Sequence, residues 1–295
     1  MNLTLDLLKI ALLAACGWAV AAGLRRGAAS ARHDLWLLVI LGAVLVPAAA
    51  RLLPPLYVIV PAGWDAPAAP PALLAVWVLG ALVWTARLVP GLVALRRVAR
   101  RGERWNAPVL AEAARLAGVT RPVTLLRSRE VQVPATWGVR RPVIALPQAA
   151  ASWTPERLRL VLVHELVHVR RQDVIVEALL WLAGALYWFH PAVWLATARL
   201  RLERERACDE AVLATGARAS DYCEHLVEIM RAATRGARGA VIGATMATPC
   251  TLEQRVRSLL ASPPPRPASG GVVFVLVGAA LIYALGAVAP CASGW

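Results

Sequence analysis

The sequence has little lysine, little phenylalanine and few charged side chains. Lys9 is the one lysine among 32 basic residues, and the chain has 18 acidic residues and two phenylalanines. Its five cysteines form no Cys-x-x-Cys pair, which excludes a zinc finger of ordinary spacing and gives no sign of a disulfide framework. Charged residues make up only 17% of the chain, which argues against an ordinary soluble domain.

Apolar side chains and arginine are abundant instead. Hydrophobic residues make up 59% of the chain, the mean hydropathy is +0.58, and several apolar runs approach the ~20 residues needed to cross a bilayer. The formal net charge of +14 comes almost entirely from arginine, and the arginines stand beside the apolar runs. That placement favours topology signals and contact with anionic membrane lipid over direct binding of nucleic acid.

Four apolar stretches are predicted to be transmembrane helices. They cover residues 3–24, 35–53, 72–95 and 272–290. The first begins almost at the N-terminus and ends in Arg25-Arg26, which favours a retained helix over a cleaved signal peptide. The chain is therefore expected to be a polytopic α-helical membrane protein, with three helices in residues 1–95 and a fourth near its C-terminus.

Arginine placement orients these helices. Arginines follow the first and third predicted helices, whereas the end of the second helix and the loop after it carry only Arg51 and Asp65. By the positive-inside rule the N-terminus lies outside and residues 96–266 lie in the cytoplasm, with 291–295 as a short extracytoplasmic tail. Residues 96–266 mix helix and strand patterns, so they are expected to form an inserted α+β domain.

Within this inserted domain, the pattern of apolar runs predicts strands and a buried helix. Strands are expected at residues 123–126, 130–133 and 143–146, separated by proline and glycine. Thr154 is expected to cap a helix that opens with Pro155 and ends near residue 172. Because most faces of this helix are apolar, it is expected to be buried.

The buried helix carries the pentapeptide His164-Glu165-Leu166-Val167-His168. Two histidines at i and i+4 lie about one turn apart on one helix face, so both rings can reach a single metal ion. The pattern predicts a zinc peptidase, with His164 and His168 as ligands of Zn²⁺ and Glu165 as the general base. The alternative is a helix with two core histidines and a surface glutamate.

A zinc peptidase needs a third protein ligand and an open position for water. Glu205 is the predicted ligand, on a helix where Asp209 at i+4 is expected to hold a ligand histidine by its free ring nitrogen. Cys208 is a softer alternative ligand, and the two acids can otherwise simply balance neighbouring arginines. Glu203 faces nearly the opposite side and is expected to pair with a neighbouring arginine.

The sequence leaves the role of residues 174–197 open. This stretch is long and apolar enough to cross a membrane, apart from Glu177 and His190-Pro191. A single crossing would separate Glu205 from the histidine pair, so the stretch is expected to be buried, to lie at the membrane surface, or to dip in and return at Pro191. His190 is a candidate transition-state donor, although packing or capping is the simpler role for a histidine before proline.

These residues resemble the membrane-embedded gluzincins of the BlaR/MecR antirepressor family. The resemblance is carried by His164–Asp173, by Glu205–Val212, by Pro134-x3-Gly138-x3-Pro142-x-Ile144-x-Leu146-Pro147, and by Phe189-His190-Pro191-x2-Trp194. It covers roughly residues 1–290 and is most specific over 134–215.

The resemblance implies a multi-pass protein of the bacterial inner membrane with a cytoplasmic, gluzincin-like zinc endopeptidase domain. Family members cleave themselves and inactivate a small DNA-binding repressor of the BlaI/MecI type, so such a repressor is the expected protein partner. Self-association into a homo-oligomer stays open. The matched residues also place the substrate cleft at Pro134, Ala135, Thr136 and Gly138, where an extended peptide can add as a strand.

The sequence departs from the sensor-transducers of that family. It ends at Trp295 without a penicillin-binding domain, and it has no Ser-x-x-Lys motif. Direct sensing of β-lactams through a covalent serine is therefore not expected. The inducing signal is expected to come through the loop at 54–71, through a separate sensor or through the membrane.

Two other classes stay open at this point. A non-catalytic membrane receptor or scaffold would bind a partner through a peptidase-like domain, but it would not need the intact Glu165. A membrane-tethered DNA-binding protein is disfavoured, because the sequence has no helix-turn-helix signal and its arginines track helix ends.

Overall fold

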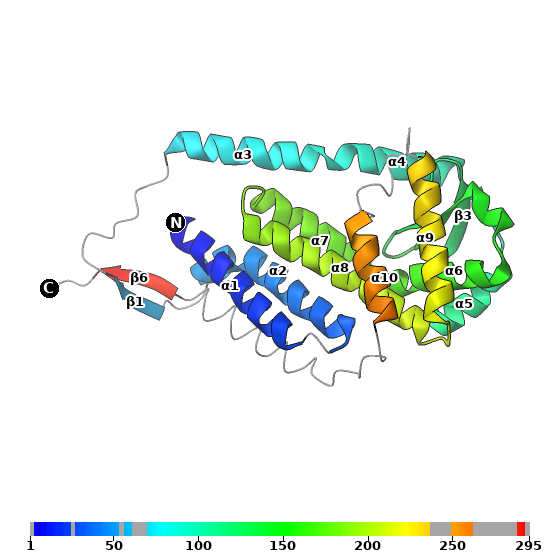
Figure 1. Ribbon diagram of the computed structural model, residues 1–295. Helices are drawn as coiled ribbons and strands as arrows, with labels where there is room; N and C mark the ends of the chain where they lie inside the picture. Colours follow the sequence, from blue (N-terminus) through cyan, green and yellow to red (C-terminus); the bar gives the residue numbers. More distant parts are fainter. Residues whose placement is uncertain are drawn as a thin grey trace. The chain divides into compact units, whose positions relative to one another are not determined.

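The computed structural model describes residues 3–24, 27–52, 56–60, 70–236, 249–261 and 288–292. Over these residues the protein is mostly helical, with one four-stranded and one two-stranded sheet (Figure 1). The chain divides into two compact units. Unit 1 comprises Met1–Ala86, Leu179–Glu203 and Pro265–Trp295, and unit 2 comprises Arg87–Ala178 and Arg204–Pro264.

The N-terminal part of unit 1 contains the helices α1 (Leu3–Gly23), α2 (Ala29–Leu52) and α3 (Pro71–Ala86). α1 and α2 pack side by side, and the rings of Trp18 and Trp36 meet edge to face with their centroids 5.1 Å apart. β1 (Leu56–Val60) pairs in parallel with β6 (Val288–Ala292). Short strands therefore link two parts of unit 1 that are far apart in sequence.

The end of α7 (Asp173–Leu186) and the first half of α8 (Pro191–Leu213) also belong to unit 1. The turn between them is hydrogen-bonded to α1, α2 and α3. These bonds join Trp77 Nε1 to the Leu186 carbonyl at 2.9 Å, the Tyr187 hydroxyl to the Ala43 carbonyl at 2.9 Å, and His190 Nε2 to the Leu7 carbonyl at 3.3 Å. Residues 174–197, which the sequence left open, thus form two helices that turn at Pro191 and not one continuous helix.

Close packing fixes this turn against α3. The indole of Trp188 lies so near Gly80 that a Cβ at this position would overlap the ring, and Trp84 approaches Gly184 in the same way. Small residues that let large rings approach a helix backbone are a common device for packing helices in membranes. We infer that the two glycines set the separation between α3 and the α7–α8 turn.

Two described helical segments are long and apolar enough to cross a membrane. They are Asp6–Gly23 in α1 and Pro71–Arg101, which includes α3 and α4 (Leu88–Arg101). α3 and α4 are separated where Pro90 has no N–H to donate to the carbonyl of Ala86. These segments correspond to the predicted helices at 3–24 and 72–95.

The other two predicted membrane helices stay predictions. Residues 35–52 are helical and belong to α2. The predicted helix at 272–290 lies outside the described residues except for 288–290, which belong to β6.

Unit 2 is built on a four-stranded sheet with the order β2-β3-β5-β4. The strands are β2 (Glu103–Arg104), β3 (Thr124–Ser128), β4 (Ala135–Trp137) and β5 (Val143–Pro147). β3 and β5 are parallel, whereas β4 runs antiparallel to β5 with Thr136 opposite Ile144. In the described part of the chain β4 pairs with β5 alone, so β4 is an edge strand.

The strand predicted at 130–133 is wrong. Those residues form a turn and a bend, and the strand follows at 135–137. Val131 and Val133 alternate with polar residues as in a strand, but Val131 packs into the core from a loop. Gly138, with φ +88°, then turns the chain back toward β5, which fixes β4 as the short segment before it.

The helix α6 (Pro155–Arg171) is buried, as the sequence predicted. Thr154 caps it by accepting a hydrogen bond from the Arg157 amide at 3.3 Å, and Gln172 ends it in the left-handed conformation with φ 57°. Three leucines of its apolar faces are fully buried, Leu160, Leu162 and Leu166. Burying each such side chain contributes roughly 1.5–3 kcal/mol, so the histidine-bearing helix is anchored along its length.

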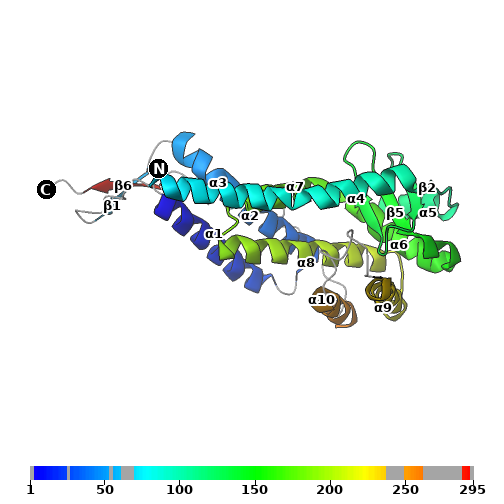
Figure 2. The same cartoon turned by 90° about the horizontal axis from the view of Figure 1, so that it is seen from above.

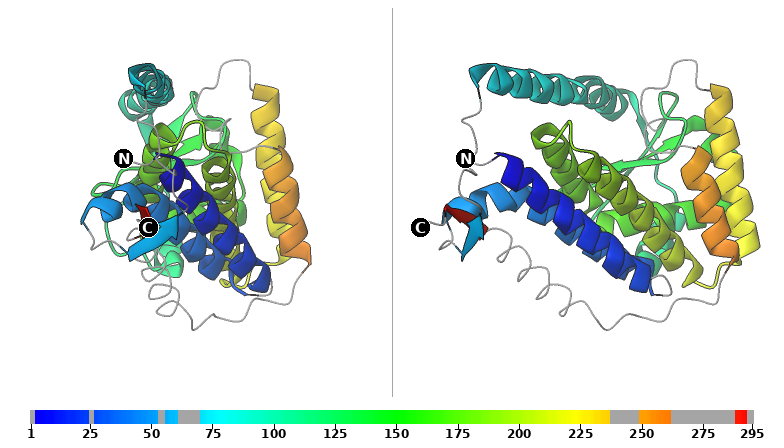
Figure 3. Two further views of the ribbon diagram at one scale, coloured as in Figure 1. Left: turned by 90° about the vertical axis from the view of Figure 1, so that its left-hand side faces the viewer. Right: turned by 60° about the vertical axis from the view of Figure 1, so that its left-hand side comes forward.

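Four further helical segments complete unit 2. They are α5 (Val109–Ala117), the 3₁₀ helix η1 (Gln148–Ser152), α9 (Ala219–Gly236) and α10 (Pro249–Leu260). α5 packs against α6 beside the sheet (Figure 2), and α9 and α10 lie side by side (Figure 3). Unit 2 contains most of the predicted domain at 96–266 but not residues 179–203, which belong to unit 1.

Candidate metal centre

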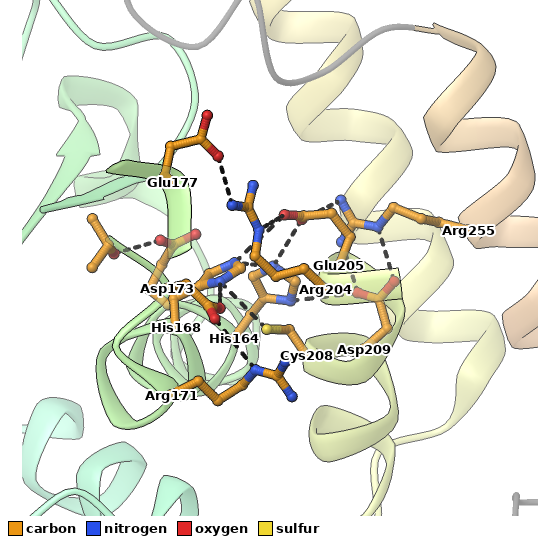
Figure 4. A network of polar contacts seen from close by, with 12 residues as sticks. His164, His168, Arg171, Asp173, Glu177, Arg204, Glu205, Cys208, Asp209 and Arg255 are labelled. Atoms are coloured by element: carbon orange, nitrogen blue, oxygen red, sulfur yellow. Dashed lines mark hydrogen bonds and ion pairs between the residues drawn. The ribbon is translucent and has the colours of Figure 1, made fainter. Parts of the chain in front are cut away.

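The two histidines of α6 face each other. His164 Nε2 and His168 Nε2 are 3.2 Å apart, and both side chains are largely buried (Figure 4). Their spacing follows from the helix, because residues at i and i+4 lie on one face. The structure therefore brings together the two rings that the sequence predicted to share a metal ion.

Glu205 of α8 reaches the same point. Its Oε2 lies 3.5 Å from His164 Nε2 and its Oε1 lies 3.9 Å from His168 Nε2. Tetrahedral zinc with bonds of about 2.0–2.1 Å holds its ligand atoms about 3.3 Å apart. Two imidazole nitrogens and one carboxylate at these separations fit a zinc ion that keeps a fourth position free.

Asp173 contacts Nδ1 of His168, the ring nitrogen that does not face His164. Asp173 Oδ2 lies 2.7 Å from His168 Nδ1, at the point where α7 begins. A proton on Nδ1 leaves the Nε2 lone pair for a metal, which is how carboxylates orient metal-binding histidines. The sequence contained this signal, since an aspartate follows the motif by five residues, but its role was not predicted.

Tyr222 of α9 contacts Nδ1 of His164, the ring nitrogen that does not face His168. His164 Nδ1 donates to the Tyr222 hydroxyl at 2.9 Å, and this hydroxyl donates to Asp209 Oδ1 at 2.8 Å. The direct distance from His164 Nδ1 to Asp209 Oδ1 is 3.4 Å. Asp209 thus lies where the sequence expected it, and Tyr222 bridges it to the ring.

Glu165 lies on the sheet side of the cluster. Its Oε2 accepts a hydrogen bond of 2.6 Å from Thr136 Oγ1 in the edge strand β4. The other residues predicted to line a cleft, Pro134, Ala135 and Gly138, are half-buried in and around the same strand. The general-base candidate and the edge strand are therefore joined directly.

Cys208 is close enough to compete as a ligand. His164, His168 and Cys208 offer ligand atoms within 4.8 Å of one another. However, Cys208 Sγ lies 3.4 Å from His168 Nδ1, the nitrogen that Asp173 holds, and not beside the facing Nε2 atoms. The geometry favours Glu205.

Arginines balance the buried carboxylates. Arg204 contacts Glu177 at 2.9 Å and Glu205 at 3.4 Å, and Arg255 of α10 contacts both Glu205 and Asp209. Burial opposes ionisation of Asp209, but Arg255 and His164 outweigh it and lower the pKa of Asp209 to about 2. Both Glu205 and Asp209 are therefore carboxylates, the form that binds or supports a metal.

His164 responds to the same carboxylates. Burial lowers the pKa of its imidazole, but the hydrogen-bonding contacts with Asp209 and Glu205 outweigh burial and raise the pKa to about 9. The pKa of Glu205 is lowered well below its ordinary range, because His164, His168 and Arg255 oppose the effect of burial. A positive charge is thus favoured at the point where the ligand atoms meet.

The remaining candidates lie elsewhere. His190 belongs to unit 1 and packs at the α7–α8 turn, which agrees with the simpler of its two expected roles. Glu203 also belongs to unit 1, and it pairs with Arg32 of α2 at 2.8 Å. Tyr222 and Arg255 were missed, because no motif in the sequence marks a tyrosine or arginine on a separate helix.

The fold and this cluster indicate a membrane-associated peptidase. A family profile described as "BlaR1 peptidase M56" matches residues 64–259, which is more than half of the chain, so this chain belongs to that family. The resemblance to BlaR/MecR proteins that the motifs predicted is thereby confirmed.

Individual relatives match over a shorter region. "Regulatory protein BlaR1" of Bacillus licheniformis is 40% identical over 93 residues, which are 32% of this chain and 16% of that protein. "Methicillin resistance mecR1 protein" of Staphylococcus aureus is 26% identical over 92 residues, which are 31% of this chain and 16% of that protein. The matches thus span only about a sixth of these relatives' length.

Proposed function

We propose that this protein is a membrane-anchored zinc endopeptidase that acts in regulation. The observation that carries the proposal is the convergence of His164 Nε2, His168 Nε2 and the Glu205 carboxylate at 3.2–3.9 Å. Each ring is oriented by a hydrogen bond on its other nitrogen. Metal-free core histidines would not need a third acid at the same point.

The side chains divide the work of peptide hydrolysis. His164, His168 and Glu205 would hold a zinc ion, which when bound would supply Lewis acidity toward a water molecule and the scissile carbonyl. Glu165 would accept a proton from the attacking water and deliver it to the leaving amine. Asp173 and Tyr222 keep the two imidazoles in the orientation that presents Nε2.

The edge strand β4 is the proposed binding site of the substrate peptide. Its outer edge has no strand partner among the described residues, and Thr136 connects it to Glu165. An extended peptide that adds to this edge gains backbone hydrogen bonds and passes beside the general base. Pro134, Ala135, Thr136 and Gly138 are the residues that would line this path.

Thr136→Val is expected to lower kcat about 10-fold or more, while Thr136→Ser keeps kcat within a few fold of wild type. The valine removes the hydroxyl that holds Glu165, and hydrogen bonds to a charged group are worth about 1.5–3 kcal/mol. Steady-state hydrolysis of a peptide by the purified chain checks this expectation. Equal kcat values for the valine and serine variants would contradict the assigned contact.

The proposed substrates are this chain itself and a DNA-binding repressor of the BlaI/MecI type. Support comes from the family and from the regulatory names of the two relatives. The proposed topology places the peptidase domain of residues 96–266 on the cytoplasmic side of the bacterial inner membrane, where a repressor would be found. Two apolar helical segments support a membrane location.

The competing function is a scaffold that binds a partner without cutting it. The hydrogen bond between Thr136 and Glu165 favours the enzyme, because a scaffold has no use for a glutamate oriented beside two metal-binding rings. Both functions require the same fold, so only chemistry separates them.

Mass spectrometry of fragments in membranes that contain the chain and a candidate repressor tests the proposed function. The expected result is a set of fragments from one or both proteins that disappears on zinc chelation and returns when zinc is added. An identical fragment set with and without chelator would count against a zinc endopeptidase and favour the scaffold.

A further inference from the structure

Arg255 of α10 reaches the metal centre. Its Nε donates to Asp209 Oδ2 at 2.8 Å and its Nη2 donates to Asp209 Oδ1 at 2.7 Å. Its Nη1 lies 3.3 Å from Glu205 Oε2 (Figure 4). One guanidinium therefore makes a two-pronged contact with one carboxylate and touches a second, with only 14% of its side chain exposed.

The two carboxylates need a counter-charge. Glu205 and Asp209 are four residues apart on one face of α8, and like charges at that spacing repel. They also clamp the same imidazole, since Glu205 lies beside Nε2 and Asp209 beside Nδ1 of His164. The planar guanidinium of an arginine can donate two parallel hydrogen bonds to one carboxylate, which the ammonium of a lysine cannot do. This contact sets the orientation of the carboxylate as well as balancing its charge.

A series of hydrogen bonds leads from Arg255 to His164, a proposed zinc ligand. Arg255 holds Asp209, Asp209 accepts from Tyr222, and Tyr222 accepts from His164. Through Nη1 the same guanidinium also limits the position of the Glu205 carboxylate. Two of the three proposed zinc ligands thus depend on one arginine that does not itself bind metal.

α10 packs against the core of unit 2 through apolar side chains as well as through Arg255. Leu259 is buried in the core of unit 2, and Val256 packs against the same core. The pair formed by Arg257 and Glu253 on this helix is exposed to solvent, with 78% and 69% of the side chains accessible. α10 therefore has its own apolar anchor, and Arg257 is a matched control.

We infer that Arg255 is a positioning residue that sets the zinc affinity of this site by holding Glu205 and Asp209 in place. This role rests on the proposed zinc site. It gives α10, which lies outside the His-Glu-x-x-His motif, a part in the metal centre.

The test is zinc affinity, measured on the purified full chain in lipid nanodiscs by competition with a chromophoric chelator. Substitution of an outer contact to a metal ligand typically weakens metal binding 10–100-fold. Arg255→Met is expected to weaken zinc binding by about that factor, Arg255→Lys by less, and Arg257→Met not at all. The visible spectrum of the Co²⁺-loaded chain is expected to shift in Arg255→Met and to stay unchanged in Arg257→Met.

The outcomes separate this role from a structural one and from the proposed function. A folded Arg255→Met chain with wild-type zinc affinity and Co²⁺ spectrum would overturn the role. If circular dichroism shows that Arg255→Met does not fold, then the lysine variant decides: unchanged zinc affinity in Arg255→Lys overturns the role, and weakened affinity supports it. A wild-type chain that binds no zinc would overturn the proposed function itself.

Discussion

Glu165→Gln is expected to lower kcat for peptide hydrolysis about 10³-fold, because a positioned general base typically contributes 10²–10⁴-fold. The amide keeps the shape of the carboxylate and can still contact Thr136, but it cannot take a proton. Since Glu165 is not one of the three converging ligands, zinc affinity is expected to stay within a few fold of wild type. Steady-state kinetics and zinc competition on the same preparation measure both quantities.

A glutamate on the same helix provides the control. Glu156 lies in the first turn of α6, is exposed, and is the acidic residue of that turn. Glu156→Gln removes the same charge from α6 and is expected to leave kcat unchanged. A Glu165→Gln variant that hydrolyses peptide as fast as Glu156→Gln would show that Glu165 is not the base.

Glu205→Gln is expected to weaken zinc binding more than about 100-fold, beyond the 10–100-fold typical of outer contacts to a metal ligand. The substitution replaces an anionic ligand with a neutral amide, and it leaves His164 and His168 as the only strong protein ligands. Activity is expected to fall with zinc occupancy and to recover partly at high zinc. Chelator competition gives the affinity, and kinetics at several zinc concentrations give the recovery.

Cys208→Ala is the comparison that identifies the third ligand. The thiol lies beside Nδ1 of His168, so its loss is expected to change zinc affinity by a few fold at most. X-ray absorption at the zinc edge adds a structural readout, because a Zn–S bond gives a shell at about 2.3 Å whereas N and O ligands lie at about 2.0–2.2 Å. A sulfur shell in the wild-type spectrum that disappears in Cys208→Ala would reassign the ligand from Glu205 to Cys208.

The histidine-bearing helix was predictable from sequence because local rules determine it. Thr154, Pro155 and the apolar faces specify its start and its burial, and the His-Glu-x-x-His spacing acts within a single turn. The role of Glu205 as a ligand was predictable only from Asp209, four residues later on the same helix face, and from the family pattern. In each case the signal lies in residues close together in sequence.

The partners of these residues were not predictable in the same way. Tyr222 and Arg255 reach the site from α9 and α10, and nothing near them in sequence marks a contact with a residue far along the chain. The strand at 135–137 was displaced in the prediction because the alternation of Val131 and Val133 with polar residues resembles a strand pattern. The α7–α8 turn was left open because composition alone does not distinguish a single crossing from two helices that return.

Zinc at this centre is proposed to drive hydrolysis through Glu165. The most direct measurement follows zinc content and peptide hydrolysis together in one preparation of the full chain, before chelation, after chelation and after zinc is restored. We expect one zinc per chain, and hydrolysis that stops and returns with the metal in wild type but stays absent in Glu165→Gln. Hydrolysis that persists in the zinc-free chain, or in the zinc-loaded Glu165→Gln chain, would contradict it.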